Sequence, residues 1–227
     1  MAGQRPSEET SEKKKAELRT AALTKRDEMT SAVAEEASRA LCERLQDVEP
    51  LQACSSIAGY APIRNEIDAG RYLVGRKAAG ARLYFPRVSG EDTLEFIEVD
   101  SLDELSEGAF GVPEPSGEPA PIDAIEVFLV PGAAFDHQGR RLGFGRGYYD
   151  RALGRALAAS QKSAQQDSER RDAQSQGPRR PLIVGICYDW QLIEGEVPTE
   201  PHDISMDVIA TNEEAIWCSS RSPDIYK

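Results

Sequence analysis

The chain has 227 residues, of which 39 are acidic and 27 are lysine or arginine, so its formal net charge at pH 7 is −12. With 40% hydrophobic and 29% charged residues, the composition is that of an ordinary globular protein, and the length suits one α/β domain. An acidic surface disfavours nucleic acid and anionic membranes as partners, because phosphate binding requires a basic face, although a local basic pocket remains compatible with it.

Targeting and metal-binding patterns are weak in this sequence. The first fifteen residues contain no apolar core of a signal peptide, and the longest apolar stretch, 127–135, is far shorter than the roughly 20 residues that span a bilayer. The cysteines lack CxxC spacing and the chain has two histidines, which disfavours a zinc site or a disulfide framework. We therefore expect a cytoplasmic protein with reduced thiols and no membrane contact.

The N-terminal part of the chain has the composition of helices. Residues 1–13 are polar, and we expect them to be frayed. Residues 12–48 are rich in helix-forming residues, and an apolar residue recurs every four positions from Val33 to Leu45, which predicts a helix with one apolar face. Because Thr30 offers an N-cap, we expect two helices with a break near Met29.

The middle of the chain changes to the patterns of strands. Residues 56–60 form a short apolar run typical of a buried strand, and residues 69–79 predict a helix after it. Residues 82–85 and 94–99 alternate as strands do. Residues 111–121 contain four prolines, so we expect an irregular surface connection there.

The second half predicts buried strands separated by one helix. Residues 125–130 are the most apolar run, typical of a central strand that is buried on both faces. A helix is expected over residues 147–160, followed by a buried strand at 182–188 and a last short strand at 208–211. Alternating strands and helices predict a three-layer α/β fold, with a mostly parallel sheet and helices on both faces.

We expect a single α/β catalytic domain over residues 14–227, interrupted by a low-complexity insert at about 160–181. That insert has almost no apolar residues and is rich in glutamine, serine and charge. It cannot bury enough surface to offset the entropy of ordering, so we expect a mobile, solvated loop. Partner binding by the insert is the less favoured alternative.

The segment from Leu129 to Arg151 is the densest candidate site. After the predicted central strand, glycines at 143, 145 and 147 precede a predicted helix. Glycine lets backbone amides approach an anion, and a helix N-terminus presents unpaired N–H groups. With three arginines nearby, this pattern favours phosphate binding over a plain turn, although it is neither a Walker A loop nor GxGxxG; the arginines are Arg140, Arg141 and Arg146.

Carboxylates at two places in the sequence each allow two interpretations. Asp150 lies three residues after Gly147, where it can complement a helix dipole or bind the Mg²⁺ that accompanies a nucleotide. The proline-bounded loop 198–203 carries Glu200, His202 and Asp203, and such a loop can be a binding site or a turn.

Two further positions are less specific. Lys15 and Arg19 lie one helical turn apart, so they face the same way, which is also true of many solvated helix faces. Glu66 follows the end of a predicted strand, where a carboxylate can bind a ligand or cap a helix.

Taken together, these segments resemble the 5-formyltetrahydrofolate cyclo-ligase family, also called methenyltetrahydrofolate synthetase. The most specific match is RLGFGRGYYDR, from Arg141 to Arg151. The other matches are individually weak but occur in the order of the family: Lys15-xxx-Arg19, Tyr60–Pro62, Glu66–Asp68, Phe85–Val88, the rest of Pro131–Arg151, Gly185–Gln191 and Val197–Thr211.

The resemblance implies an enzyme that uses ATP and Mg²⁺ to convert 5-formyltetrahydrofolate to 5,10-methenyltetrahydrofolate, with release of ADP and phosphate. It implies that Asp150 and Asp203 hold Mg²⁺, that Arg146 and Tyr148 act in the chemical step, and that folate is bound by Ala61, Glu66, Gly145, Arg146, Gly147 and Tyr148. The implied nucleotide-binding residues are Lys15, Arg19, Arg141, Leu142, Gly143, Phe144, Gly145, Arg146, Gly147, Tyr148 and Tyr149. The chain departs from the family pattern at Phe144, Arg146 and Asn212, and none of these departures removes a residue that the reaction needs.

Other functions stay open at this point. The main alternative is a nucleotide-binding α/β regulatory protein without turnover; a scaffold that recruits a partner through the insert and a phosphate-binding isomerase are further ones. ADP release that depends on 5-formyltetrahydrofolate separates the cyclo-ligase from all three. We expect a monomer whose small-molecule partners are 5-formyltetrahydrofolate and ATP.

Overall fold

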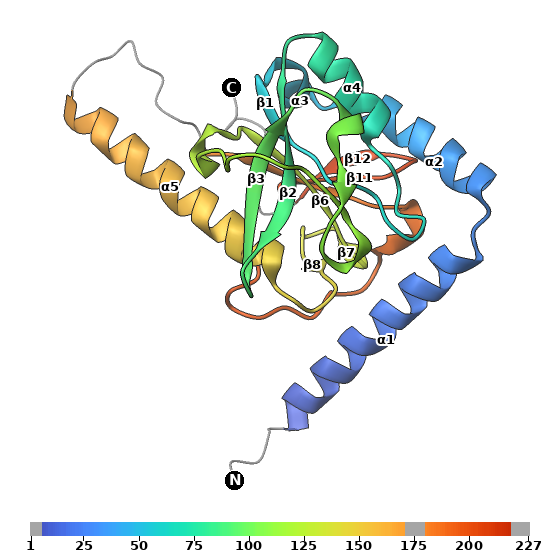
Figure 1. Cartoon of the computed structure of the whole chain (residues 1–227). Coiled ribbons are helices and arrows are strands. Elements are labelled where there is room, and N and C mark those ends of the chain that lie inside the picture. The colour runs from blue at the N-terminus through green and yellow to red at the C-terminus, as the bar shows by residue number, and fades with distance from the viewer. Residues whose placement is uncertain (1–5, 171–179, 219–227) are drawn as a thin grey trace.

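The computed structural model describes residues 6–170 and 180–218. Its centre is a seven-stranded sheet in the order β12-β11-β9-β6-β1-β2-β3 (Figure 1). The four inner pairings are parallel, and the edge strands β3 and β12 are antiparallel to their neighbours. The strands are β1 (Ser56–Ala58), β2 (Arg82–Ser89), β3 (Thr93–Val99), β6 (Val127–Pro131), β9 (Leu182–Ile186), β11 (Val208–Ala210) and β12 (Ala215–Trp217).

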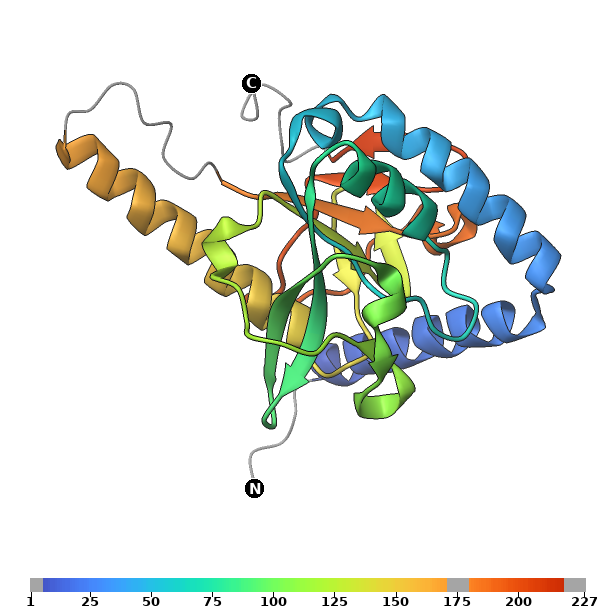
Figure 2. The same cartoon turned by 45° about the horizontal axis from the view of Figure 1, so that its top comes forward.

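Helices cover both faces of this sheet, as predicted. One apolar cluster joins α2, α3 and α4 to one face, and a second cluster joins α5 to the other (Figure 2). α1 packs elsewhere, with Ala22 in a small apolar cluster at the start of β7. The helices are α1 (Pro6–Glu28), α2 (Ser31–Arg44), α3 (Glu49–Ala53), α4 (Gly70–Ala78) and α5 (Tyr148–Arg170).

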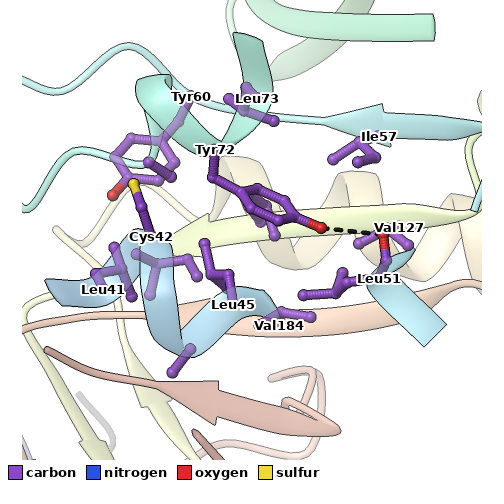
Figure 3. Close-up of a cluster of buried hydrophobic side chains, with 14 of the residues drawn as sticks. Leu41, Cys42, Leu45, Leu51, Ile57, Tyr60, Tyr72, Leu73, Val127 and Val184 are labelled. Atoms are coloured by element: carbon purple, nitrogen blue, oxygen red, sulfur yellow. Dashed lines mark hydrogen bonds between the residues drawn. The ribbon is translucent and has the colours of Figure 1, made fainter. Parts of the chain in front are cut away.

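The larger apolar cluster explains the position of α2 (Figure 3). Leu41 and Leu45 are fully buried in it, whereas Val33, at the start of the predicted apolar stripe, is exposed. Tyr72 of α4 places its ring in the same cluster and donates a hydrogen bond of 3.0 Å to the carbonyl oxygen of Leu51. The buried hydroxyl is thus satisfied, as a polar group in an apolar core must be.

Two smaller sheets flank the main one. The first has the order β10-β7-β8, and two of its strands, β7 and β8, come from the segment that the sequence singled out for phosphate binding. The second pairs β4 with β5 before the central strand. Their strands are β4 (Ser106–Glu107), β5 (Pro113–Glu114), β7 (Ala134–Asp136), β8 (Arg141–Leu142) and β10 (Leu192–Ile193).

The strand order creates a crevice between β1 and β6. From β1 the chain continues to β2 on one side, whereas β6 pairs with the other side of β1. The connections that leave the carboxyl ends of these two strands therefore diverge, and ligands of open α/β sheets bind at such a switch point. This geometry places the candidate site at the carboxyl end of the central strand, where the sequence predicted it.

The break between the first two helices is confirmed, but the predicted frayed N-terminus is too long. Thr30 is the N-cap of α2, and its hydroxyl oxygen accepts a hydrogen bond of 3.4 Å from the Val33 amide. α1 begins at Pro6, within the stretch predicted to be frayed. Proline is favoured in the first turn, and the glutamates and lysines after it are good helix formers, so polarity alone was a poor guide.

The predicted loop at about 160–181 is also partly wrong. α5 continues to Arg170, ten residues beyond its predicted end, and the part of the predicted loop at 171–179 lies outside the described residues. The sequence argument considered only burial of apolar surface. A helix satisfies its own backbone hydrogen bonds, so a polar stretch such as 161–170, in which glutamine is the commonest residue, can extend one that is already anchored.

Candidate active site

A cavity of about 470 Å³ opens at the carboxyl ends of β1 and β6. Its walls come from α1, from the connection after β1, from the glycine-rich turn before α5 and from the loop 198–203. Every site residue that the family resemblance implied lines it. These residues are Lys15, Arg19, Ala61, Glu66, Arg141, Leu142, Gly143, Phe144, Gly145, Arg146, Gly147, Tyr148, Tyr149, Asp150 and Asp203.

The glycine-rich turn connects β8 to the N-terminus of α5. Gly145 and Gly147 have φ angles of +95° and +65°, the left-handed region that glycine adopts without strain. The carbonyl oxygen of Gly147 accepts the first helical hydrogen bond, 3.1 Å from the Arg151 amide. The turn therefore brings the N-terminal end of a long helix to the cavity wall, an arrangement suited to phosphate.

α1 supplies two cationic side chains to the cavity. The Lys15 ammonium is buried and lies 2.7 Å from Glu200 Oε1. Burial lowers the pKa of Lys15, but its hydrogen bond to Glu200 and the negative charges nearby raise that pKa above the usual value, so the side chain stays protonated. Arg19 Nε donates a hydrogen bond of 2.9 Å to the carbonyl oxygen of Gly143. One helix thus contacts both the glycine-rich turn and the loop 198–203.

Arg141 and Asp150 form an ion pair in the wall of the cavity, with Arg141 Nη2 2.8 Å from Asp150 Oδ2. The other oxygen of Asp150 accepts a hydrogen bond of 3.3 Å from the Ile204 amide. The Arg141 guanidinium also lies 5.6 Å from the centre of the Tyr149 ring. Asp150 therefore ties α5 to β8 and to the chain after loop 198–203, in addition to its position at a helix N-terminus.

The carboxylates at the cavity fit Mg²⁺ when a phosphate supplies further ligands. Asp203 Oδ2 accepts a hydrogen bond of 2.7 Å from the Glu200 amide, and His202 Nε2 lies 3.7 Å from Asp203 Oδ1. Within residues 6–170 and 180–218, no group of three or more His, Cys, Asp or Glu side chains forms a ready-made metal site. Mg²⁺ is commonly held by one or two carboxylates together with substrate phosphates, which agrees with Asp150 and Asp203.

Glu66 also lines the cavity, and its side chain is almost fully buried. Its Oε1 is 2.9 Å from Arg26 Nη1, and its Oε2 accepts a hydrogen bond of 3.2 Å from the Ile63 amide. Burial raises the pKa of the Glu66 carboxyl, and the charge and hydrogen bonds of Arg26 and Ile63 oppose that rise. Arg64 and Asn65 both have positive φ angles, so the turn before Glu66 is a tight one.

Sequence reasoning missed Arg26. Its signal was the helical periodicity: Arg26 lies seven residues after Arg19 and eleven after Lys15, which places all three on one face of α1. Ala22 lies on the same face and is buried. Following the helix face of Lys15 and Arg19 for two further turns, to i+7 from Arg19, would have identified it.

The arginines of the glycine-rich segment do not all reach the cavity. Arg140 lies 3.2 Å from Glu196 and 3.6 Å from Asp136, and it is not among the described residues that line the cavity. Asp136 is itself a structural residue, since it accepts hydrogen bonds from three backbone amides. The expectation that Arg140 would flank the phosphate nest is therefore wrong.

Arg146, unlike Arg140, lines the cavity, and its guanidinium lies 4.2 Å from the centre of the Phe110 ring. Phe110 is 61% exposed, has a φ angle of +59° and lines the cavity. The sequence predicted only an irregular connection for the region just after it. The Tyr148 hydroxyl donates a hydrogen bond of 3.2 Å to the carbonyl oxygen of Glu91, so its ring forms part of the wall.

Comparison with known proteins agrees with this arrangement. A model of the 5-formyltetrahydrofolate cyclo-ligase family matches residues 11–212. The chain is similar to a mitochondrial 5-formyltetrahydrofolate cyclo-ligase of Arabidopsis thaliana (28% identity, covering 76% of this chain and 65% of that protein). It is also similar to the 5-formyltetrahydrofolate cyclo-ligase of Mycolicibacterium smegmatis (28% identity, covering 91% of this chain and 97% of that protein).

The fold is similar as well. The solved structure of Aquifex aeolicus 5,10-methenyltetrahydrofolate synthetase superimposes with a TM-score of 0.71 at 30% identity, covering 92% of this chain and 94% of that one. The family match spans the first helix, the glycine-rich turn and the loop 198–203, which are the segments that build the cavity. The chain therefore belongs to the 5-formyltetrahydrofolate cyclo-ligase family and is an enzyme of that family.

Proposed function

We propose that this enzyme converts 5-formyltetrahydrofolate to 5,10-methenyltetrahydrofolate in an ATP- and Mg²⁺-dependent reaction that releases ADP and phosphate. The observation that carries the proposal is the composition of one cavity. It joins a glycine-rich turn at a helix N-terminus, buried or half-buried cationic side chains, two carboxylates suited to Mg²⁺ and, at its other end, the buried carboxylate of Glu66.

In the proposed reaction, the formyl oxygen of the substrate attacks the γ-phosphorus of ATP and the bond to ADP breaks. This step forms an intermediate, a phosphate ester on an iminium carbon, and that carbon is more electrophilic than the carbon of the formyl group. N10 of the folate then attacks that carbon and loses its proton, the five-membered ring closes, and phosphate leaves. Phosphoryl transfer of this kind asks the protein mainly for alignment and for neutralisation of charge.

The part of the cavity that we assign to the nucleotide offers both alignment and neutralisation of charge. Lys15 and Arg19 bring positive charge from α1, Arg146 brings it from the glycine-rich turn, and the N-terminus of α5 adds unpaired amides. We assign Arg146 to the charge that develops on the transferred phosphoryl group. Asp150 and Asp203 would hold Mg²⁺, which would supply positive charge to neutralise the phosphates.

The folate end is built around Glu66. An ionised carboxylate accepts hydrogen bonds from two neighbouring N–H groups, which is the donor pattern that a pterin ring offers. Ala61, Gly145 and Gly147 are small lining residues that leave room for a flat ring, and Tyr148 lines the cavity as well. Because this chemistry requires no acid–base pair, the reaction gives neither His137 nor His202 a necessary role.

A coupled assay tests the proposal directly. The purified protein should release ADP only when 5-formyltetrahydrofolate, ATP and Mg²⁺ are all present, and the methenyl product should appear by its absorbance in equal amount. Tetrahydrofolate, which lacks the formyl oxygen, is the matched control and should give no ADP. A nucleotide-binding regulatory protein without turnover would bind ATP but release no folate-dependent ADP, which would disprove the proposal.

We also propose that the enzyme works in the cytoplasm. All four cysteines are buried free thiols: Cys42, Cys54, Cys187 and Cys218. Free thiols are typical of a reducing compartment. Among the described residues, no helix is long and apolar enough to cross a membrane. Fractionation of the source cells with an antibody against the chain tests this assignment.

A further inference from the structure

The buried ion pair behind the folate end of the cavity has no role in the reaction described above. Arg26 is 2% exposed and Glu66 8% exposed at the side chain, and they are joined at 2.9 Å. Glu66 lines the cavity, whereas Arg26 is not among the described residues that line it. Arg26 therefore lies behind the carboxylate that faces the substrate.

A buried charge of this kind is costly unless it is paired. Taking a carboxylate or a guanidinium out of water carries a penalty that an ion pair of good geometry offsets only in part. In addition, Arg26 Nε is buried without a hydrogen-bond partner, so the guanidinium is not optimally satisfied. An ion pair that lowers stability and lies next to a ligand site suggests that the pair has a role in function.

Arg26 also connects this end of the cavity to the rest of the site. It lies on the face of α1 that carries Lys15 and Arg19, which contact Glu200 and the carbonyl oxygen of Gly143. Its guanidinium is 5.2 Å from the centre of the Phe144 ring, in the glycine-rich turn. Asn65 Nδ2, next to Glu66, donates to the carbonyl oxygen of Arg26 at 2.9 Å.

We propose that Arg26 is a positioning residue for the folate: from behind Glu66, it keeps that carboxylate ionised and in one orientation toward the cavity. This inference rests on the proposed function, because it assumes that Glu66 accepts hydrogen bonds from the substrate. Arg26 touches neither substrate nor nucleotide in this role. It acts through Glu66 alone.

The other groups around Glu66 do not supply the charge. Three tyrosine hydroxyls are near enough to sense the charge of Glu66: those of Tyr60, Tyr149 and Tyr188, from the connection after β1, from α5 and from the segment after β9. Burial raises the pKa of each of these hydroxyls, that of Tyr188 to about 12, so all three stay neutral near physiological pH. Arg26 is the cation whose charge opposes protonation of Glu66.

Removal of Arg26 should therefore raise the pKa of Glu66 further. In Arg26→Met, a smaller fraction of Glu66 is ionised at neutral pH, so affinity for 5-formyltetrahydrofolate falls and recovers as the pH rises. We expect a dissociation constant for 5-formyltetrahydrofolate about tenfold higher or more at pH 7, with the midpoint of the pH dependence shifted upward and the dissociation constant for ATP within about threefold of wild type.

Calorimetric titration of each ligand separately, from about pH 6 to about pH 9, measures these values. The matched control is Lys25→Met, which removes a neighbouring cation of α1 that lies 4.5 Å over the Trp190 ring instead of at Glu66. We expect its folate affinity and pH profile to equal those of wild type. Arg26→Lys, which keeps the charge, should restore most of the affinity lost in Arg26→Met.

A double variant guards against loss of folding. Arg26→Met/Glu66→Gln replaces both charges by neutral groups, a change that buried pairs often tolerate. It should bind folate no more weakly than Glu66→Gln alone, because Arg26 acts only through Glu66. Equal weakening of folate and ATP in Arg26→Met, an unchanged pH profile, or a double variant much weaker than Glu66→Gln would overturn the inference. Wild-type protein that does not bind 5-formyltetrahydrofolate would instead disprove the proposed function.

Discussion

At the scale of single residues, Glu66 combines a structural contact, its ion pair with Arg26, with a proposed role in folate binding. We predict that Glu66→Gln weakens binding of 5-formyltetrahydrofolate and leaves ATP binding nearly intact. A hydrogen bond to a charged group contributes about 1.5–3 kcal/mol, so the dissociation constant should rise roughly 10- to 150-fold. Equilibrium titration with each ligand measures both effects on the same protein.

The same change also affects stability. Glutamine keeps an acceptor for Arg26 but removes the charge that pairs with this buried cation at 2.9 Å, so the variant should unfold at a lower temperature than wild type. Thermal unfolding therefore has to accompany the titrations, at a temperature where the variant is fully folded. An equal loss of affinity for both ligands would show that Glu66 supports the fold or the nucleotide instead.

The metal assignment depends on Asp150 and Asp203. We predict that Asp150→Asn and Asp203→Asn each need far more Mg²⁺ for half-maximal rate, because each removes an anionic oxygen ligand from a site that has few. The effects should not be additive in the double variant, since both side chains would contact one ion. Initial rates measured over a range of Mg²⁺ concentrations at saturating ATP provide the comparison.

Charge removal as such has to be separated from loss of a ligand. Asp100→Asn removes a carboxylate that pairs with Lys77 outside the cavity, and its Mg²⁺ dependence should equal that of wild type. Asp150 also pairs with Arg141 and accepts a hydrogen bond from the Ile204 amide, so Asp150→Asn can lower the rate by destabilising the fold. A thermal unfolding curve of this variant has to accompany the rate measurements. Wild-type Mg²⁺ dependence in both variants would show that these aspartates serve only the ion pair and the turn.

At the scale of elements, sequence reasoning identified a segment that lines the cavity because its signal is local. The glycine spacing, the apolar run before it and the start of the helix after it all lie between Ile125 and Arg151, so a single stretch of sequence carries the pattern. Strand β6 and the start of α5 agree with that prediction within two residues. The same holds for the break between α1 and α2, which depends on the Thr30 cap.

The rest depends on contacts between distant segments, which no local pattern shows. The ion pair of Arg26 with Glu66 joins residues 40 positions apart, and the approach of Arg19 to Gly143 spans 124 positions. Short strands such as β7, β8 and β12 have two or three residues each, too few to show an alternation. Their pairing partners define them instead.

The length of α5 leads to a prediction about the low-complexity segment. The helix is anchored by Ala152, Leu153 and Ala156 in the core, and Ser160 is the last buried residue among the α5 side chains that the structure describes. We predict that replacing residues 161–179 by a short Gly/Ser linker leaves turnover within a few-fold of wild type, since the core contacts of α5 precede the replacement. Steady-state rates of both proteins give the comparison.

The contrasting variant is Leu153→Ala, within the anchored part of α5. A buried leucine truncated to alanine costs about 2–5 kcal/mol of stability, so this variant should show a clearly lower unfolding temperature, whereas the linker variant should not. A drop in turnover of more than about tenfold in a linker variant that unfolds cooperatively would correspond to roughly 1.4 kcal/mol in the barrier. It would mean that the segment contributes to the active site.

At the scale of the whole molecule, the surface favours a monomer. The exposed large apolar side chains of the described residues are Val33, Val74, Phe110 and Phe144, and the last two line the cavity. Stable dimers usually bury a larger apolar surface, and a net charge of −12 adds repulsion between copies. We predict a mass of one chain, 24.9 kDa, by light scattering at micromolar concentration. A mass of two chains would show an interface formed by other surfaces.

Ligand binding should also stabilise the molecule as a whole, because the cavity is assembled from segments that are distant in the chain. α1 packs Ala22 and Leu18 into a small apolar cluster, and it makes polar contacts through Lys15, Arg19 and Arg26. A ligand that touches several walls at once binds the folded state and not the unfolded chain. Its binding free energy then adds to the free energy of unfolding.

We therefore predict a ligand-dependent rise in the unfolding temperature. At a concentration 100 times the dissociation constant, a ligand adds about 2.7 kcal/mol, which for a chain of this size corresponds to roughly 5–11 °C. ATP with Mg²⁺ and 5-formyltetrahydrofolate should each give a shift of this order in a calorimetric scan. In Glu66→Gln, at the same ligand concentrations, the shift caused by folate should shrink while the shift caused by ATP with Mg²⁺ stays. If the folate shift is unchanged in that variant, the folate end of the cavity does not depend on Glu66.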